Sequence, residues 1–295
     1  MVMHDEHRFL VDCGEGTQRQ IMQAGIGFKR LNRILITHGH LDHILGLAGL
    51  LSTFSRWETT IEEIEIYGGS WALERIHDLI YGVVLRGANP PMKINFVPIQ
   101  TGKIIDEDDF RVTAFPVYHR GPDCFGYLFE EYARRPFLPE KAEALQIPPG
   151  PWRRDLVNGA TVTLPDGRVI TPAEVLGPER PGTRLVMVGD AGRTDDLLEI
   201  CRDADALVIE ATYLDADAEL ARQFAHLTAR QGAELAIKAG IKNLLLTHIS
   251  RRYRERDVIA EARSVFPNAV VARDFDDYQI KRGELRKVEL SEAEE

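Results

Sequence analysis

The sequence predicts an α/β fold, and three observations support this class. Short runs rich in β-branched residues alternate with amphipathic stretches through most of the chain. The length of 295 residues is enough for one large α/β domain with a sizeable core. The hydrophobic content of 44% and the charged content of 28% are those of an ordinary globular protein, which excludes a disordered, collagen-like or coiled-coil chain. We therefore expect a single domain over residues 1–295.

The expected elements follow from the order of these runs. Residues 8–12 form the first strand, Gly14 and Gly16 turn the chain into a helix over 17–24, and the β-branched run 33–37 forms a second strand that ends in a polar cluster. Further strands are expected at 64–67, 94–99, 110–117, 124–130, 184–188, 206–209, 244–247 and 269–272. Apolar residues at helical spacing predict helices at 70–81, 194–202, 216–225, 228–239 and 256–265.

The segment 132–182 interrupts this alternation. It holds nine of the 15 prolines and a hairpin signal over 161–170, in which Pro165-Asp166-Gly167 separates two β-branched runs. A long loop without structure is improbable inside a compact domain. We therefore expect a protruding arm with its own short strands, although the composition alone also fits a plain surface insertion.

Composition limits the compartment and the partners. Three scattered cysteines, Cys13, Cys124 and Cys201, suit neither a disulfide framework nor a thiolate zinc site. No apolar run approaches the ~20 residues of a membrane span, and the charged start differs from a signal peptide, so we expect a cytoplasmic protein without a membrane partner. The net charge of −10 disfavours a polyanionic partner unless a local basic patch binds it.

The strongest chemical signal is the run His38-Gly39-His40-Leu41-Asp42-His43, directly after the strand 33–37. Imidazole nitrogens and carboxylate oxygens are the ligands that zinc takes, and packing alone rarely requires so many in six residues. His38 and His40 are two residues apart and can project together, whereas Asp42 and His43 are carried around the turn towards a second position. The spacing therefore indicates two metal ions rather than one.

Three more candidate ligands each follow a predicted strand. They are His119, Asp190 and His248. Each alone is weak evidence, because a lone histidine after a strand is often a surface residue and an aspartate there often caps the next helix. Their joint placement at matching ends of strands favours a shared site.

These residues resemble the metal-binding set of the metallo-β-lactamase superfamily. Narrower motifs resemble the ribonuclease Z family of tRNA 3′-processing endonucleases over nearly the whole chain. The motifs are Asp-Cys-Gly-Glu-Gly-Thr-Gln-Arg-Gln at 12–20, Phe-Gly-Tyr at 125–127, Glu-Ala-Thr at 210–212, His-Leu-Thr at 226–228 and Leu-Thr-His-Ile-Ser-Arg-Arg-Tyr at 246–253.

The resemblance implies a four-layer αββα sandwich with a protruding arm, two zinc ions per subunit and a homodimer. One zinc ion would take His38, His40 and His119, the other would take Asp42, His43 and His248, and Asp190 would bridge them. Manganese suits the same nitrogen and oxygen ligands. The implied substrate is precursor tRNA, cut to leave a 3′-hydroxyl on the tRNA and a 5′-phosphate on the trailer.

The resemblance also implies roles for other residues. Asp42 would orient or deprotonate the attacking water, and His226, supported by Glu210, would protonate the departing ribose 3′-oxygen. Because Arg251 and Arg252 closely follow His248, we expect them to meet phosphates near the cleavage point.

On the arm, the family's tRNA-gripping segment corresponds to Pro149-Gly150-Pro151. Arg153 and Arg154 would add positive charge there for tRNA binding. That they are only solvent-exposed surface residues is an equally good alternative.

Two other functions fit parts of the pattern. One is a superfamily hydrolase that acts on small phosphodiesters or sulfate esters, which would not need the arm. The other is a catalytically silent RNA-binding protein, which would bind RNA but hold zinc poorly. A metal-binding assay would distinguish it from the nuclease. The resemblance further implies a strand and a glycine-rich loop ahead of residue 12, where this chain has only about eight residues before its first expected strand. We therefore expect translation to start upstream of Met1, which the intact mass of the native protein would test.

Overall fold

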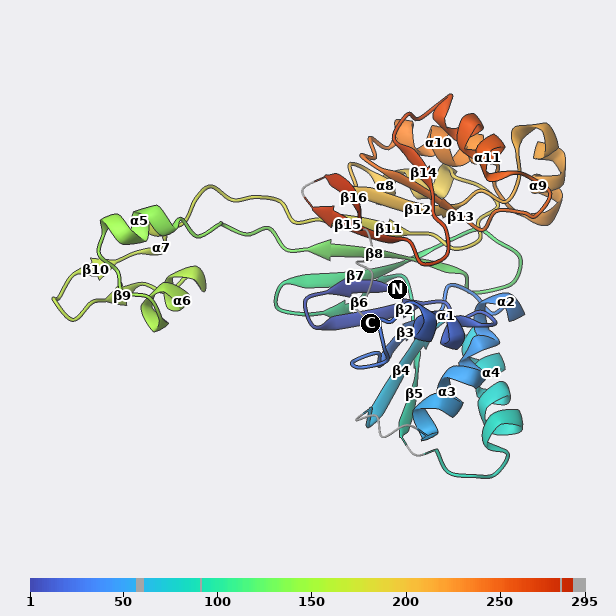
Figure 1. The fold of residues 1–295 in the computed structure, drawn as a ribbon, viewed down its shortest axis with the longest axis horizontal. Helices are drawn as coiled ribbons and strands as arrows, with labels where there is room; N and C mark the ends of the chain where they lie inside the picture. Colours follow the sequence, from blue (N-terminus) through green and yellow to red (C-terminus); the bar gives the residue numbers. More distant parts are fainter. Residues whose placement is uncertain (57–60, 91, 282, 289–295) are drawn as a thin grey trace, which may run out of the picture.

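The computed structural model describes residues 1–56, 61–90, 92–281 and 283–288. Two β-sheets pack face to face, and helices cover the outer face of each sheet, so the four layers follow the predicted αββα order (Figure 1). The first sheet has the strand order β1-β2-β3-β4-β5, and the second has the order β14-β13-β12-β11-β8-β7-β6. No helix in the described part of the chain combines the length and hydropathy needed to cross a bilayer.

The first sheet belongs to the N-terminal part of the chain. Its strands are β1 (Val2–His4), β2 (His7–Val11), β3 (Arg33–Leu35), β4 (Glu63–Gly68) and β5 (Lys93–Pro98). Strand β1 pairs antiparallel with β2, and the remaining neighbours are parallel. The helices on this sheet are α1 (Thr17–Gln23), α2 (Leu41–Ile44), α3 (Gly46–Arg56) and α4 (Ser70–His77), which continues as the π-helix η1 (Asp78–Leu85).

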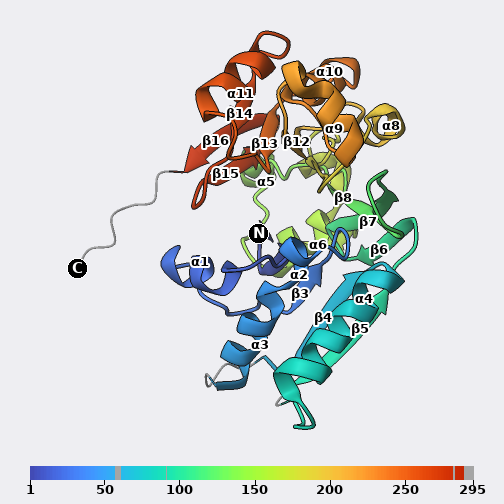
Figure 2. The same cartoon turned by 90° about the vertical axis from the view of Figure 1, so that its right-hand side faces the viewer.

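The second sheet carries the later elements. Its strands are β6 (Gly102–Asp106), β7 (Phe110–Pro116), β8 (Phe125–Glu131), β11 (Arg184–Met187), β12 (Ala206–Glu210), β13 (Leu244–Thr247) and β14 (Ala269–Val271). Its helical elements are η2 (Asp195–Leu197), α8 (Leu198–Cys201), η3 (Asp215–Asp217), α9 (Ala218–Phe224), α10 (Ala229–Lys238) and α11 (Glu255–Arg263). A hairpin of β15 (Asp277–Lys281) and β16 (Glu284–Val288) ends the described chain. Figure 2 shows the two helical layers on opposite sides of the paired sheets.

The space between the sheets is filled by aromatic and aliphatic side chains. Phe9 of the first sheet contacts Phe129 of the second, with ring centroids 5.4 Å apart. Tyr127 is fully buried, and its hydroxyl donates a hydrogen bond of 2.6 Å to the carbonyl of Ile36. This bond fixes the second sheet to the end of β3, immediately before the histidine-rich run.

Several elements differ from the sequence prediction. The helix α3 was not predicted, although its buried apolar residues recur at the spacing of one helical face: Leu47, Leu50, Leu51 and Phe54. The strands β1, β6, β15 and β16 were also missed, since they are short, polar or at a sheet edge. The predicted helices 194–202 and 216–225 each begin as a 3₁₀ turn with acidic residues, η2 and η3. None of these differences moves the predicted strands out of the two sheets.

The segment 132–182, called the arm below, projects far from the paired sheets (Figure 1). The chain leaves after β8 and returns at β11, and isolated bridges Arg134–Arg180 and Phe137–Leu176 join the outgoing and returning segments. The arm contains α5 (Pro139–Ala144), α6 (Pro151–Val157), β9 (Val162–Thr163), β10 (Val169–Ile170) and α7 (Pro172–Val175). The predicted hairpin is therefore present as β9 and β10, and three short helices accompany it.

The arm has a hydrophobic cluster of its own. Its buried members are Ala142, Ile147, Leu156, Val162, Leu164, Ile170, Val175 and Leu176. Each of its three helices starts with a proline in the first turn, where the missing N–H is not needed and the fixed φ suits a helix. Three of the nine prolines that identified the arm in the sequence, Pro139, Pro151 and Pro172, therefore begin helices, which explains why these helices were not predicted.

Candidate metal centre

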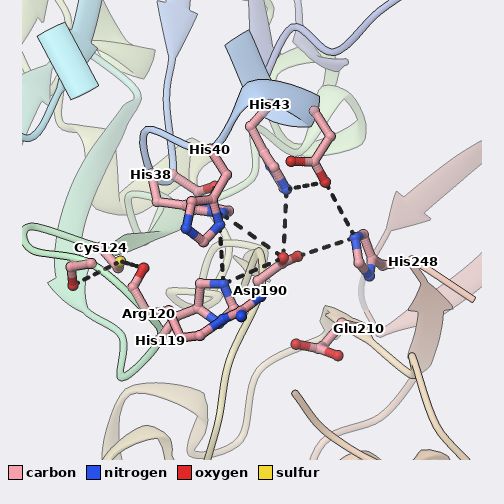
Figure 3. A network of polar contacts seen from close by, with 12 residues as sticks. His38, His40, His43, His119, Arg120, Cys124, Asp190, Glu210 and His248 are labelled. Carbon is pink, nitrogen blue, oxygen red and sulfur yellow. Dashed lines mark hydrogen bonds and ion pairs between the residues drawn. The ribbon is translucent and has the colours of Figure 1, made fainter. Parts of the chain in front are cut away.

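The seven predicted ligands lie together at one end of the two sheets (Figure 3). The run that follows β3 supplies His38, His40, Asp42 and His43. The ends of β7, β11 and β13 point to the same place, and His119, Asp190 and His248 follow these strands.

The first group of ligand atoms surrounds one position. His40 Nδ1 lies 2.9 Å from His38 Nε2 and 3.4 Å from His119 Nε2. Asp190 Oδ2 lies 3.6 Å from His119 Nε2 and 3.9 Å from His38 Nε2. All four ligand atoms lie within 4.8 Å of one another. This is a spacing at which they could hold one ion.

The second group shares Asp190 with the first. His43 Nε2 lies 3.6 Å from Asp42 Oδ2 and 3.6 Å from Asp190 Oδ2. His248 Nε2 lies 3.6 Å from the other carboxylate oxygen, Asp190 Oδ1. Because Asp190 faces both groups and its side chain is only 4% exposed, the donor set fits two neighbouring divalent ions better than one.

Most of the ligand histidines are held through the nitrogen that faces away from the centre. His43 Nδ1 lies 2.7 Å from Asp12 Oδ2, and His119 Nδ1 lies 2.7 Å from the carbonyl oxygen of Ala225. His38 Nδ1 and His248 Nδ1 lie 3.0 and 2.8 Å from threonine hydroxyls, those of Thr37 and Thr212 respectively. Such contacts fix the ring orientation and the tautomer of a metal ligand.

Two residues of the motif that begins at Asp12 hold the metal ligands in place. Asp12 also accepts hydrogen bonds of 2.8 Å from the backbone N–H and the hydroxyl of Thr37, so one carboxylate fixes both His43 and the turn before His38. At Gly14, a Cβ atom would lie 2.2 Å from the carbonyl oxygen of Asp42. Only glycine permits this close approach, which explains its place in the motif.

Electrostatics keep the first group of ligands in states that suit a metal ion. Burial and the charge of His43 lower the pKa of His38 to about 2. Burial also lowers the pKa of His40 and of His119. Burial works in the opposite direction on Asp190, but the hydrogen bond from His43 and the charge of His248 hold the pKa of Asp190 below its usual value. The first group therefore presents neutral imidazoles and an ionised carboxylate.

A buried acid–base pair lies beside the ligands. Glu210 is 1% exposed and accepts hydrogen bonds of 2.7 Å from the N–H of Ala191 and 3.1 Å from the N–H of Leu227. His226 Nδ1 lies 2.9 Å from Glu210 Oε1. Burial alone would lower the pKa of His226, but the hydrogen bond and charge of Glu210 outweigh it and raise this pKa.

A cavity of about 570 Å³ opens onto the centre. Its lining residues are His40, Leu41, Asp42, Arg75, Arg120, Asp190, His226 and His248. Arg75 and Arg120 were not predicted from the sequence, because nothing in it shows that α4 and the turn after β7 bring them to the metal centre. Arg120 directly follows the ligand His119, which was the available signal.

The predicted substrate-binding residues occupy two places. Arg251 and Arg252 are exposed in the turn between His248 and α11, next to the centre. The arm residues lie at the other end of the sandwich: the arm joins the body where β8 ends and β11 begins, whereas β7, β11 and β13 end at the ligands.

The arm residues are not equally available. Pro149 and Gly150 are exposed in the loop before α6, and Pro151 is the first residue of α6. Arg153 donates from Nε and Nη2 to the carbonyl oxygen of Ile147, at 3.0 and 2.7 Å. Its guanidinium therefore stabilises the arm itself, whereas the side chain of Arg154 is 74% exposed.

Comparisons with known proteins agree with this geometry. Residues 1–138 match the family described as the metallo-beta-lactamase superfamily. The chain is 44% identical to a ribonuclease Z of Bradyrhizobium diazoefficiens over 269 residues, which is 91% of this chain and 89% of that protein. It is 45% identical to a ribonuclease Z of Bradyrhizobium sp. (strain ORS 278) over 276 residues, 94% of this chain and 91% of that protein.

Among solved structures, the short form of human tRNase Z superimposes with a TM-score of 0.61 at 25% identity, covering 93% of this chain and 88% of the human chain. Identity and coverage at these levels, together with the fold and the cluster of histidines and aspartates, define the family. The chain therefore belongs to the ribonuclease Z family of metal-dependent endoribonucleases.

Proposed function

We propose that the protein removes the 3′ trailer from precursor tRNA with two zinc ions, leaving a 3′-hydroxyl on the tRNA and a 5′-phosphate on the trailer. The observation that carries this proposal is the pair of ligand groups that share Asp190. Two adjacent divalent ions suit in-line cleavage of a phosphodiester, because negative charge grows on both the attacking and the leaving oxygen.

The first ion would be held by His38, His40 and His119, the second by Asp42, His43 and His248, with Asp190 shared. Zinc or manganese suits these donors. When bound, the ions would supply a water of lowered pKa and neutralise charge on the phosphate.

The chain's own residues would position the water and move the protons. The side chain of Asp42 is 67% exposed at the cavity, so it can accept a hydrogen bond from the attacking water and orient it. His226 lines the same cavity, and the contact with Glu210 favours its protonated form. It would donate its proton to the departing ribose 3′-oxygen, while Glu210 stabilises the charged ring before the transfer.

Two features support tRNA as the substrate. The relatives that match over nine-tenths of the chain carry the name ribonuclease Z, and the related human structure is a tRNase Z. The arm supplies a second surface, with exposed Pro149, Gly150 and Arg154, that a hydrolase of small esters would not need.

The position of the arm supports a homodimer. It leaves the body at the end opposite the metal centre, so the arm of one subunit is directed away from its own centre (Figure 1). We therefore expect the arm of one subunit to hold the tRNA that is cut at the centre of the other.

The experiment that tests this function uses zinc-loaded protein and a 5′-labelled precursor tRNA with a 3′ trailer. We expect one cut at the end of the acceptor stem and none with Asp190→Ala. A zinc-loaded protein that hydrolyses bis(p-nitrophenyl) phosphate but leaves the precursor intact would instead indicate a hydrolase of small diesters.

A further inference from the structure

The side chain of Arg120 has an unusual position for an arginine in this acidic protein. It is exposed and lines the cavity over the metal centre together with Asp190 and His226. Among the residues that the structure describes, no carboxylate lies within ion-pair distance of its guanidinium. The guanidinium instead stacks on the ring of Phe224, with Cζ 5.6 Å from the ring centroid. An arginine stacked on an aromatic ring and free of acidic partners is prepared to bind an anion.

The neighbouring arginines are already engaged. Arg75, which lines the same cavity, donates from Nη1 to the carbonyl oxygen of Gly39 at 2.7 Å and stacks on Trp71 at 5.1 Å. It therefore braces the turn between His38 and His40. Arg193 stacks on Tyr118 and pairs with Asp196. Of these three cations, Arg120 is the one whose hydrogen-bonding groups remain available.

The contacts of Arg120 place it on one side of the cleavage site. Phe224, on which it stacks, ends α9 two residues before His226. The intervening residue, Ala225, contacts His119 through its carbonyl oxygen at 2.7 Å. Arg120 and His226 thus belong to one packed unit. Asp42 comes from α2 in the first half of the chain and belongs to the other ligand group.

In an in-line displacement, the leaving oxygen departs opposite the attacking water. If His226 protonates the leaving 3′-oxygen, the last nucleotide of the tRNA product lies on the side of His226, and so does the phosphate on the 5′ side of that nucleotide. We infer that Arg120 binds this phosphate, one nucleotide upstream of the bond that is cut. The inference rests on the proposed function and assigns a substrate contact within its site.

The test combines variants of Arg120 with precursor tRNAs that carry one neutral methylphosphonate. The linkage is replaced either on the 5′ side of the last tRNA nucleotide or at the second phosphate of the trailer. The zinc-loaded variants are Arg120→Ala, Arg120→Lys and the control Arg202→Ala, an exposed arginine that pairs with Glu199 on α8. Cleavage of bis(p-nitrophenyl) phosphate, which lacks neighbouring nucleotides, reports on the metal centre.

We expect Arg120→Ala to raise KM for the unmodified precursor by about ten-fold, the effect of one charge-assisted phosphate contact. The upstream methylphosphonate should have a similar effect on the wild type and no further effect on Arg120→Ala, because both changes remove the same contact. Arg120→Lys should recover part of the loss. Arg202→Ala should match the wild type on both substrates, and Arg120→Ala should impair hydrolysis of the small diester much less than cleavage of the precursor.

Three results would overturn the inference. One is an unchanged KM for Arg120→Ala on the unmodified precursor. Another is that Arg120→Ala no longer raises KM on the precursor with the trailer methylphosphonate but still raises it on the precursor with the upstream methylphosphonate. The third is an equal loss of small-diester hydrolysis, which would mean that Arg120 only supports His119. A wild type that hydrolyses the small diester but not the unmodified precursor would refute the proposed function, and this inference with it.

Discussion

A substitution in the arm can test whether tRNA binding and phosphodiester hydrolysis depend on different parts of the molecule. The perturbation is Leu156→Ala in α6. Leu156 is fully buried in the arm's own hydrophobic cluster, which includes no side chain from the two sheets. We expect this variant to unfold the arm locally and to leave the metal centre intact.

The magnitude follows from the size of the cluster. A buried Leu→Ala change costs about 2–5 kcal/mol, from lost burial and the cavity left behind. A folded unit of roughly 50 residues rarely obtains more than about 3–5 kcal/mol from its core. The substitution therefore removes as much free energy as the arm has, while the clusters of the body are untouched.

Hydrogen exchange measured by mass spectrometry would locate the effect. We expect peptides from residues 132–182 to lose protection in Leu156→Ala and those from both sheets to keep it. KM for precursor tRNA should rise at least ten-fold because a whole binding surface is lost. Zinc content and hydrolysis of bis(p-nitrophenyl) phosphate should stay at wild-type values. The matched control is Val157→Ala at the adjacent residue, which is 48% exposed.

Two outcomes would refute this reasoning. If Leu156→Ala loses protection throughout the body, the arm does not fold as a separate unit. If the arm unfolds but KM for precursor tRNA is unchanged, the arm does not bind the substrate.

Three further predictions concern the metal centre. Asp190→Ala should lose most bound metal, measured by mass spectrometry of the desalted protein, and activity on both substrates, because both ligand groups use this carboxylate; retention of two ions would contradict its shared position. Asp12→Asn should weaken zinc binding about 10–100-fold in a competition titration, since it orients His43 and Thr37, and an unchanged affinity would show that this contact is dispensable. Glu210→Gln should lower kcat and move the alkaline limb of the pH profile of kcat to lower pH. Glu210 raises the pKa of His226, so His226 loses its proton at lower pH when the Glu210 charge is removed. An alkaline limb that stays in place would exclude His226 as the general acid.

The clustering of the candidate ligands could be predicted from the sequence because the chemistry of a metal site restricts both residue type and position. Few structural reasons place His38, His40, Asp42 and His43 in one turn, and the ends of strands meet at one edge of a sheet. The structure brings these residues together with His119, Asp190 and His248. The alternation of strands and helices likewise predicted the α/β class.

The contacts that support the ligands could not be predicted in the same way. The partner of His119 is the backbone carbonyl of Ala225, which has no sequence signature. Arg75 and Arg120 reach the cavity through the packing of elements distant in the chain. The helices of the arm were hidden because proline is read as a helix breaker, whereas Pro139, Pro151 and Pro172 occupy first turns, where proline is favoured.

The attachment of the arm also has a consequence for how such a protein can change during evolution. Strands β8 and β11 are antiparallel neighbours, with Glu130 opposite Arg184, and Glu131 and Thr183 are joined by a backbone hydrogen bond of 2.9 Å. A tight turn of about two residues could therefore replace the whole arm without changing the order of any strand. A single deletion or insertion at this hairpin would therefore remove or add the arm, while the end of the sandwich that carries the metal-ligand cluster keeps its strands.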